Sequence, residues 1–418
     1  MLKTSRWLAL VAVLFALGVG LQARAADKVF RFACACDLTK VYTFAVAEIV
    51  QAQQDYVELL NMKGGVNGYR FEFLVEDSGN EPQRALEIYE RFKGQGALYF
   101  DGWSTPVGKA LTPRALEDRI ILGQMFVGRG DAVDGKTFPY VFPMGATYWQ
   151  QMARAVEHVR EREGGSLRGK KLGFVYIDSP FGREPLPVLT DLARRLEFEW
   201  KGFPVPSPAT EQSAAWTGVR AFRPDWVVIW FAGPSTPAAV REAARVGFPV
   251  DHVISVSWIG ESDMKVVGEA RAKGVQRIEG WSTGRDLPVV GEIVREVYEK
   301  AKKGHGPVER VGWTYYNIGM AEVVQLEEAV RVALRTSGEP LTGDKLKRAF
   351  ESFRDFDAKG LRPPLTITPE DHGGGQLTRI GQWDGTRFVK VADYKAPYQD
   401  IVAAEVRKGA EEFRRTGK

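Results

Sequence analysis

Residues 61–87 read NMKGGVNGYRFEFLVEDSGNEPQRALE and join the end of one helix to a strand and to the start of a second helix. Apolar residues recur at helical spacing from Val46 to Leu60, and two glycines then end that helix. Residues 69–77 form a strand-like run, and Pro82 favours the first turn of the next helix. A helix, a strand and a helix in this order predict a parallel α/β sheet.

The same alternation of short strands and longer helices continues on both sides of this stretch. It gives one complete unit up to about residue 126, and a second unit begins with a helix at Ala146. We therefore predict an α/β fold of two Rossmann-like lobes, each built on a parallel sheet. The strands that we expect lie at 28–35, 69–77, 97–102 and 120–126 in the first unit, and at 170–178, 225–232, 252–258 and 274–282 in the second.

The first 25 residues have the pattern of a secretory signal peptide. Lys3 and Arg6 precede an apolar run from Trp7 to Leu21, and Ala23-Arg24-Ala25 resembles a cleavage site. A membrane anchor that stays in place is the alternative, but the run is shorter than the roughly 20 apolar residues that span a bilayer. We expect residues 1–25 to be removed and the mature chain to lie in the periplasm or otherwise outside the cytoplasm.

The charge balance limits the class of partner. The chain has 57 Lys and Arg residues against 53 Asp and Glu residues, and cleavage of the signal would remove three of the basic ones. So small an excess argues against nucleic acid or an anionic membrane surface as the partner.

The sequence offers little that could perform catalysis or bind a metal. Cys34 and Cys36 would share one face of a strand, where they could form a disulfide or remain buried thiols. Two cysteines without further ligands make a poor zinc site, and the four histidines are far apart without metal spacing. No Gly-x-Ser-x-Gly motif nominates a nucleophile. We expect no metal, no cofactor and no enzymatic activity.

One motif points elsewhere, and its context rejects it. Gly130 and Gly135-Lys136-Thr137 match the spacing of a phosphate-binding loop. Such a loop opens into a helix, whereas Pro139 and Pro143 follow here, and two acidic residues would oppose a phosphate. We expect a surface turn at this position.

Residues 61–87 also resemble the signature region of a known family, the periplasmic solute-binding proteins of branched-chain-amino-acid-type ABC transporters. The likeness is carried by an Asn-x-x-Gly-Gly-x-x-Gly turn, a strand, an acidic residue and a Pro-containing helix start, matched by Asn61, Gly64, Gly65, Gly68, Asp77 and Pro82. Residues 364–375 followed by 379–389 are similar to the C-terminal segment of the family. The likeness covers nearly the whole mature chain.

The resemblance implies two lobes that are joined by three chain crossings and close on a small molecule. One lobe would contain residues 27–145 plus 283–363, the other 146–282 plus 364–397, and 398–418 would form a charged terminal helix. The protein would act as a monomer that delivers its ligand to the permease subunits of an ABC transporter. A two-lobed sensor for a signalling partner is the alternative, and a secreted hydrolase is a third hypothesis without a nominated nucleophile.

By the same resemblance, the first-lobe site residues follow the strand ends. Ser104 and Thr105 correspond to the residues that hold a ligand carboxylate in amino-acid binders, although they could equally cap the helix that follows. Arg129 could pair with a carboxylate as a planar fork, or it could be an ordinary loop arginine. The remaining first-lobe candidates are Thr39, Tyr42, Trp103, Phe126 and Gly128.

The second-lobe candidates are Phe181, Gly233, Trp258 and Glu261. Phe181 falls where relatives often carry an aromatic residue that packs on the ligand. Trp258 lies near the position of the acidic residue that neutralises the ligand ammonium in amino-acid binders. Glu261 and Asp263 are close but displaced, which argues against an α-amino-acid ligand. The ligand class that we expect is an amino acid or a related, possibly aromatic, carboxylate. Each aromatic could instead be part of ordinary lobe packing.

Overall fold

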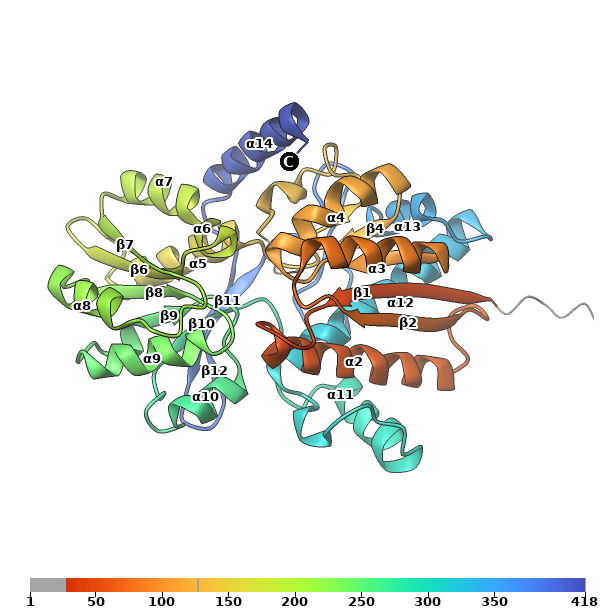
Figure 1. Ribbon diagram of the computed structural model, residues 1–418, viewed down its shortest axis with the longest axis horizontal. Helices are drawn as coiled ribbons and strands as arrows, with labels where there is room; N and C mark the ends of the chain where they lie inside the picture. Colours follow the sequence, from red (N-terminus) through yellow and green to blue (C-terminus); the bar gives the residue numbers. More distant parts are fainter. Residues whose placement is uncertain (1–27, 126–127, 418) are drawn as a thin grey trace, which may run out of the picture.

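The computed structural model describes residues 28–125 and 128–417, and it contains two lobes side by side, each with its own sheet (Figure 1). The predicted α/β class with two parallel-sheet lobes is confirmed. The predicted signal peptide lies outside the described residues. No helix in the described parts of the chain combines the length and the apolar character needed to cross a membrane.

The first lobe is built on a five-stranded sheet of order β2-β1-β3-β4-β5, in which every pair of neighbours is parallel. Helices α2, α3 and α4 connect these strands, and α11, α12 and α13 join the lobe later in the chain. The strands are β1 (Val29–Cys36), β2 (Arg70–Asp77), β3 (Ala97–Asp101), β4 (Ile121–Gly123) and β5 (Val141–Phe142), and the helices are α2 (Thr43–Met62), α3 (Pro82–Gly94), α4 (Thr105–Asp118), α11 (Pro288–Ile293), α12 (Thr314–Ser337) and α13 (Gly343–Phe350).

The second lobe is built on a seven-stranded sheet of order β12-β11-β10-β9-β8-β6-β7. Its neighbours are parallel except for the hairpin β11–β12 and its pairing with β10. The strands are β6 (Lys171–Ile177), β7 (Glu199–Val205), β8 (Trp226–Trp230), β9 (Val253–Ser255), β10 (Gln276–Glu279), β11 (Thr378–Trp383) and β12 (Phe388–Lys395). The helices are α5 (Tyr148–Arg162), α6 (Pro180–Arg183), α7 (Leu186–Leu196), α8 (Ser213–Phe222), α9 (Ser235–Arg245) and α10 (Glu261–Val267).

The chain passes between the two sheets three times. It leaves the first sheet after β5, returns to the first lobe after β10, and enters the second lobe again before β11. The last helix, α14 (Gln399–Thr416), lies over the junction of the lobes (Figure 1). The lobe bounds that we inferred from the resemblance remain a proposal.

The structure differs from the predicted strands in several places. Strand β7 was not predicted, because its sequence alternates with polar residues and contains Pro204; as an edge strand it tolerates both. The strand expected at 120–126 is limited to Ile121–Gly123, and a further short strand, β5, pairs beside it. The helix that begins at Pro288 continues beyond Ile293 with π-helical geometry to Lys300.

The turn between α2 and β2 is fixed by hydrogen bonds and by one tight approach. The side chain of Asn61 donates to the carbonyl oxygen of Phe71 at 2.8 Å and accepts from the amide of Phe71 at 2.9 Å. Gly65 has a φ of +71°, and a Cβ there would lie 2.0 Å from the carbonyl oxygen of Tyr69. This turn therefore sets where β2 begins relative to α2.

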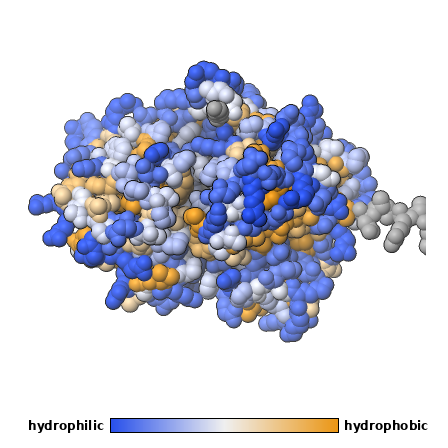
Figure 2. Space-filling view, in the orientation of Figure 1, coloured by the Kyte–Doolittle hydropathy of each residue, from blue (hydrophilic) through white to orange (hydrophobic). Residues whose placement is uncertain are grey.

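The exteriors of the two lobes are polar. Figure 2 shows charged and polar side chains over most of the face in view, with apolar residues scattered among them. The large apolar side chains are buried mainly between the sheets and their helices. Within that core α12 lies close against α2, since a Cβ on Gly319 would be 2.5 Å from the carbonyl oxygen of Ile49.

Gly65→Ala is expected to destabilise the protein clearly more than Gly68→Ala. Both positions have a positive φ, at +71° and +82°, and each would lose about 1 kcal/mol through this conformation. Only Gly65 adds a collision with backbone, because nothing lies within 4 Å of a Cβ on Gly68. Urea denaturation followed by circular dichroism would measure the difference, and equal losses for the two variants would contradict the assignment.

Candidate ligand-binding cleft

The candidate site lies between the lobes, where strands of both sheets end. In parallel sheets the loops at the carboxyl ends of the strands form the ligand-facing edge. The loop after β3 contributes Trp103, and the loop after β9 contributes Trp258 from the other lobe. Their ring centroids are 6.5 Å apart, so the strand ends of the two lobes face one another at this point.

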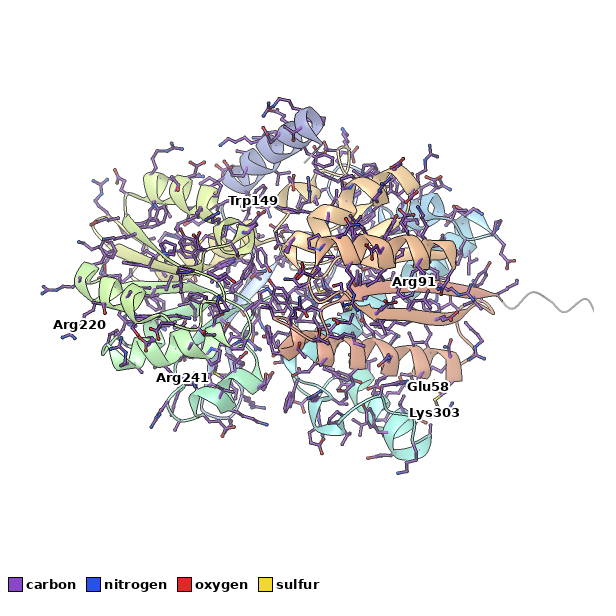
Figure 3. All side chains as sticks on the ribbon, viewed as in Figure 1. Glu58, Arg91, Trp149, Arg220, Arg241 and Lys303 are labelled. Atoms are coloured by element: carbon purple, nitrogen blue, oxygen red, sulfur yellow. A yellow bond between two sulfur atoms is a disulfide. The ribbon has the colours of Figure 1, made fainter. Side chains whose placement is uncertain are left out.

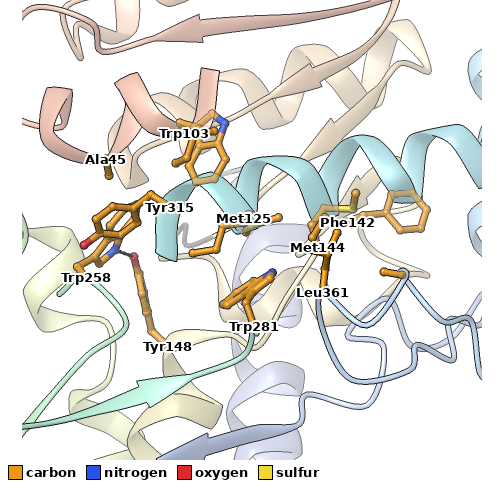
Figure 4. Close-up of a cluster of buried hydrophobic side chains, with 14 of the residues drawn as sticks. Ala45, Trp103, Met125, Phe142, Met144, Tyr148, Trp258, Trp281, Tyr315 and Leu361 are labelled. Atoms are coloured by element: carbon orange, nitrogen blue, oxygen red, sulfur yellow. Dashed lines mark hydrogen bonds between the residues drawn. The ribbon is translucent and has the colours of Figure 1, made fainter. Parts of the chain in front are cut away.

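Trp258 is the centre of an aromatic cluster that joins the lobes (Figure 4). Four side chains of the first lobe surround it: Tyr42 at 6.2 Å, Phe44 at 6.0 Å, Trp103 at 6.5 Å and Tyr315 at 5.8 Å between ring centroids. Phe44 and Tyr315 also pack edge to face at 5.6 Å. We call these five residues the interlobe aromatic cluster. It brings apolar side chains of both lobes into contact at the candidate site.

A second group of rings forms the wall on the side of the second lobe. Tyr148 packs against Phe181 at 5.1 Å and against Trp230 at 5.6 Å. The hydroxyl of Tyr148 accepts a hydrogen bond of 2.6 Å from the indole nitrogen of Trp258, which ties this wall to the interlobe aromatic cluster. Phe181 is thus part of this group of rings, and its packing on a ligand stays a prediction.

Two hydrogen-bond donors in these walls are buried without an acceptor. The indole nitrogen of Trp230 and the hydroxyl of Tyr315 have no hydrogen-bond partner within the part of the chain that the structure describes. Both side chains are at most 1% exposed. A buried donor without an acceptor is unfavourable by about 1–3 kcal/mol, so an acceptor group brought between the lobes would relieve this cost.

The two predicted carboxylate-binding hydroxyls both act within their own lobe. Ser104 has a φ of +88° and caps α4, since its Oγ accepts from the amide of Val107 at 3.4 Å. Thr105 accepts from the amide of Gly128 at 2.9 Å. A non-glycine residue held at positive φ stores strain of the kind that gathers at ligand sites. Helix α4 thus begins directly after Trp103 and Ser104, so the positive end of its dipole lies beside the interlobe aromatic cluster.

Three further predicted residues have defined positions. Thr39 donates to Asp77 at 2.8 Å and so holds the loop after β1 in place. Tyr42 is part of the interlobe aromatic cluster, and burial raises the pKa of its hydroxyl to about 12. Gly233 allows the first lobe to approach, because a Cβ there would lie 2.9 Å from the carbonyl oxygen of Val41.

Glu261 and Asp263 were the two candidates for binding a ligand ammonium group. Both accept hydrogen bonds at the amino ends of helices instead. Glu261 accepts from the amide and the hydroxyl of Thr314, at 3.1 and 3.0 Å, at the start of α12. Asp263 accepts from the amide of Gly260 at 2.8 Å at the start of α10, and burial raises its pKa to about 7. Neither carboxylate is therefore left unpaired in the cleft.

Arg129 lies in a different environment from the one that the sequence suggested. Its guanidinium stacks between the rings of Phe138 at 4.8 Å and Phe413 at 4.4 Å, and it pairs with Asp131 at 3.4 Å. The side chain belongs to the contact with α14, so we leave it out of the proposed ligand site. Phe126 lies outside the described residues.

The remaining motifs are accounted for without a reactive centre. Cys34 and Cys36 form a disulfide on β1. Gly130–Val133 form a short 3-10 turn, and Lys136 in the phosphate-loop motif is exposed. Across the two described ranges, no group of three or more His, Cys, Asp or Glu side chains could hold a metal ion.

Sequence reasoning missed one acidic residue beside the cleft. Glu48 lies on α2 one turn after Phe44 and is buried. Burial raises its pKa to about 9, and the charge of Glu261 adds to the effect. The carboxyl group is therefore neutral at pH 7. The four-residue spacing places Glu48 on the same face of the helix as Phe44, and this was the available signal. Such spacing does not show whether that face borders the other lobe or the core of its own lobe.

Glu48→Gln is expected to raise the melting temperature at pH 8 and to change it little at pH 4. The folded pKa of about 9 exceeds the ordinary value of 4.5, so the folded chain keeps a proton that the unfolded chain loses. The stability that this proton provides is complete below pH 4.5 and is lost as the pH rises towards 9. Glutamine has the shape of the neutral acid and does not titrate.

Calorimetry at pH 4, 6 and 8 measures this trend. Glu58→Gln is the control on the same helix, since Glu58 pairs with Lys303 near the surface at 2.6 Å (Figure 3). A difference between Glu48→Gln and the unaltered protein that is constant from pH 4 to pH 8 would contradict the assignment.

Comparison with known proteins identifies the family. The family model described as "Periplasmic binding protein" matches residues 31–387. A solved structure from the Pseudomonas fluorescens group, described as an ABC transporter permease, is 32% identical, with a TM-score of 0.85 over 93% of this chain and 97% of that one. No protein of curated function matches the sequence significantly.

Two more distant structures share the fold. A branched-chain amino acid ABC transporter protein from Thermus thermophilus with bound valine is 19% identical, with a TM-score of 0.77 over 90% of this chain and 98% of that one. A solute-binding protein from R. palustris in complex with benzoate is 18% identical, with a TM-score of 0.70 over 90% of this chain and 98% of that one. With two parallel-sheet lobes, three crossings and a match over most of its length, the chain belongs to the type I periplasmic binding proteins of the leucine/isoleucine/valine-binding-like family.

Proposed function

We propose that this protein captures a small organic carboxylate between its two lobes and delivers it to the permease of an ABC transporter. It acts by binding, without catalysis, and works outside the cytoplasmic membrane after loss of residues 1–25. The observation that carries the proposal is the interlobe aromatic cluster together with the unsatisfied donors of Trp230 and Tyr315. Apolar walls with a few unpaired donors favour a ligand that has an apolar body and an acceptor group.

The charges around the cleft support a carboxylate with an apolar or aromatic body. The amino end of α4 favours negative charge, and Glu261 and Asp263 are both occupied by helix amino ends. The neutral form of Glu48 is a further donor beside the cluster. Relatives of the same fold have been solved with valine and with benzoate, and both of these ligands carry a carboxylate.

Closure of the two lobes would link ligand binding to transport. Trp258 contacts four first-lobe side chains only when the lobes are together, so a ligand that bridges the walls favours this form. A ligand shifts the balance only by binding the closed form better than the open one. The permease would then recognise the closed shape. A sensor for a signalling partner would use the same closure, but no separate feature of the cleft favours it.

A thermal-shift panel tests the function. Amino acids, aromatic acids and short-chain acids are each compared with the corresponding amide, which keeps the body and removes the charge. At least one acid is expected to raise the melting temperature, since a ligand of the folded state stabilises it by mass action, and its amide is expected to raise it less. If no small molecule shifts the melting temperature while a chromogenic ester is hydrolysed, the binding function is wrong.

Ser104→Ala is expected to weaken the best acid from this panel by about 1–3 kcal/mol, because the start of α4 loses a polar contact near the ligand carboxylate. Titration calorimetry measures the affinity. Thr342→Ala is the matched control, since Thr342 caps α13 by accepting from Lys345 at 3.3 Å and is remote from the cleft. Both variants lose a helix cap, but only Ser104→Ala should bind less tightly; unchanged affinity would remove Ser104 from the site.

A further inference from the structure

The last helix of the chain is anchored on the second lobe. At its start the carbonyl oxygen of Pro397 accepts from the side chain of Gln150 on α5 at 3.0 Å. Asp400 pairs with Arg195 on α7 at 2.6 Å. Ile401, Val402 and Val406 are buried on this part of the helix, and α14 packs against α5 and α7. The first half of α14 is therefore part of the second lobe.

The end of the same helix is docked on the first lobe. Ala410 is fully buried in the core that includes β3 and β4 of the first sheet. The ring of Phe413 lies 4.6 Å from the ring of Phe138, and the guanidinium of Arg129 covers Phe413 at 4.4 Å. Arg414 donates to Thr137 and is 3.5 Å from the carboxylate of Asp134.

This docking site explains the stretch that resembled a phosphate-binding loop. Asp134 and Thr137 belong to that motif. The hydroxyl of Thr137 donates to the carboxylate of Asp134 at 2.9 Å, and both side chains also contact Arg414. The two acidic residues of the motif oppose a phosphate but suit a guanidinium. The motif is thus the part of the first lobe on which the end of α14 docks.

The approach of α14 to the junction is tight at one residue. A Cβ on Gly409 would lie 2.7 Å from Cβ of Asp131 in the first lobe and 3.3 Å from the ring of Trp149 at the start of α5. Figure 3 labels Trp149 beneath α14, between the lobes. A glycine within a helix lowers the stability of that helix by about 1 kcal/mol relative to alanine. Gly409 is therefore explained by the close packing at this point and not by helix formation.

The helix spans the junction without filling the space beneath it. A cavity of about 380 Å³ lies between Val402, Ala403 and Val406 of α14 and the last crossing at Glu370–Gln376. Beside the helix, Glu184 of the second lobe accepts from the amide of Gly130 in the first lobe at 3.0 Å. The lobes are therefore tied at the two ends of α14 and at this carboxylate.

We propose that α14 is a strap across the two lobes, and that its end must leave the first lobe before the cleft can open fully. The anchored half moves with the second lobe, so rotation of the lobes apart pulls Phe413 and Arg414 from Phe138 and Thr137. The strap thereby shifts the balance between open and closed forms towards closure before any ligand binds. It acts through residues that do not touch the ligand cleft.

The test measures the distance between the lobes in the full chain without ligand. Dyes are attached at Arg91→Cys on α3 and Arg220→Cys on α8, both exposed and on opposite lobes (Figure 3). The native cysteines are buried in a disulfide and do not take up label. Phe413→Ala, Gly409→Ala and a chain ending after Lys408 are each expected to increase the low-transfer population in single-molecule energy transfer.

Two comparisons separate release of the strap from general damage. Gly409→Ala should strengthen the helix itself yet open the lobes, a combination that a purely structural role of α14 does not produce. Arg415→Ala is the control for the surface of this helix, since Arg415 pairs only with Glu412 on the same helix among the ion pairs of the described residues, and it should leave the distance unchanged. If all three strap variants remain folded by circular dichroism and keep the distance of the unaltered protein, the strap proposal is wrong, whatever the ligand proves to be.

Discussion

The contact of Trp258 with four side chains of the first lobe is the interaction on which the closed arrangement of this protein depends. The indole extends from the loop after β9, and Tyr42, Phe44, Trp103 and Tyr315 meet it from the loops and helices of the other lobe. These residues can meet because both sheets present their strand ends at the junction. The same contact makes the junction of the lobes apolar at this point.

The polar groups around this contact are mostly occupied, and that occupation sets the chemistry of the cleft. Glu261 stabilises the start of α12, Asp263 the start of α10, and Ser104 the start of α4. Within the described residues, the indole nitrogen of Trp230 and the hydroxyl of Tyr315 are two groups that lack a hydrogen-bond partner. A cleft with apolar walls and unpaired donors differs from one built to neutralise an ammonium group, although the fold is the same.

The parts of the fold that could be predicted from the sequence depend on local signals. Residues 61–87 form a helix ending at Met62, a strand over Arg70–Asp77 and a helix beginning at Pro82, because glycine turns, alternation and proline act within a few residues. Strand β7 could not be predicted, since an edge strand needs no apolar pattern on both faces. The sequence pattern places Trp103, Phe181 and Trp258 after strands, and the parallel topology explains why such positions lie at one edge of each sheet.

Local patterns in the sequence predict two α/β lobes and place aromatic residues after their strands, although the exact strand bounds differ in the structure. Which side chains join the interlobe aromatic cluster and which pack against another helix depends on the tertiary structure. Arg129 and Phe413 lie far apart in the chain and meet only because α14 crosses the junction, and Glu48 and Tyr315 come from helices that pack side by side. Local sequence fixes backbone conformation through short-range sterics and hydrogen bonds, whereas the partner of a long side chain depends on contacts between segments that no local pattern encodes.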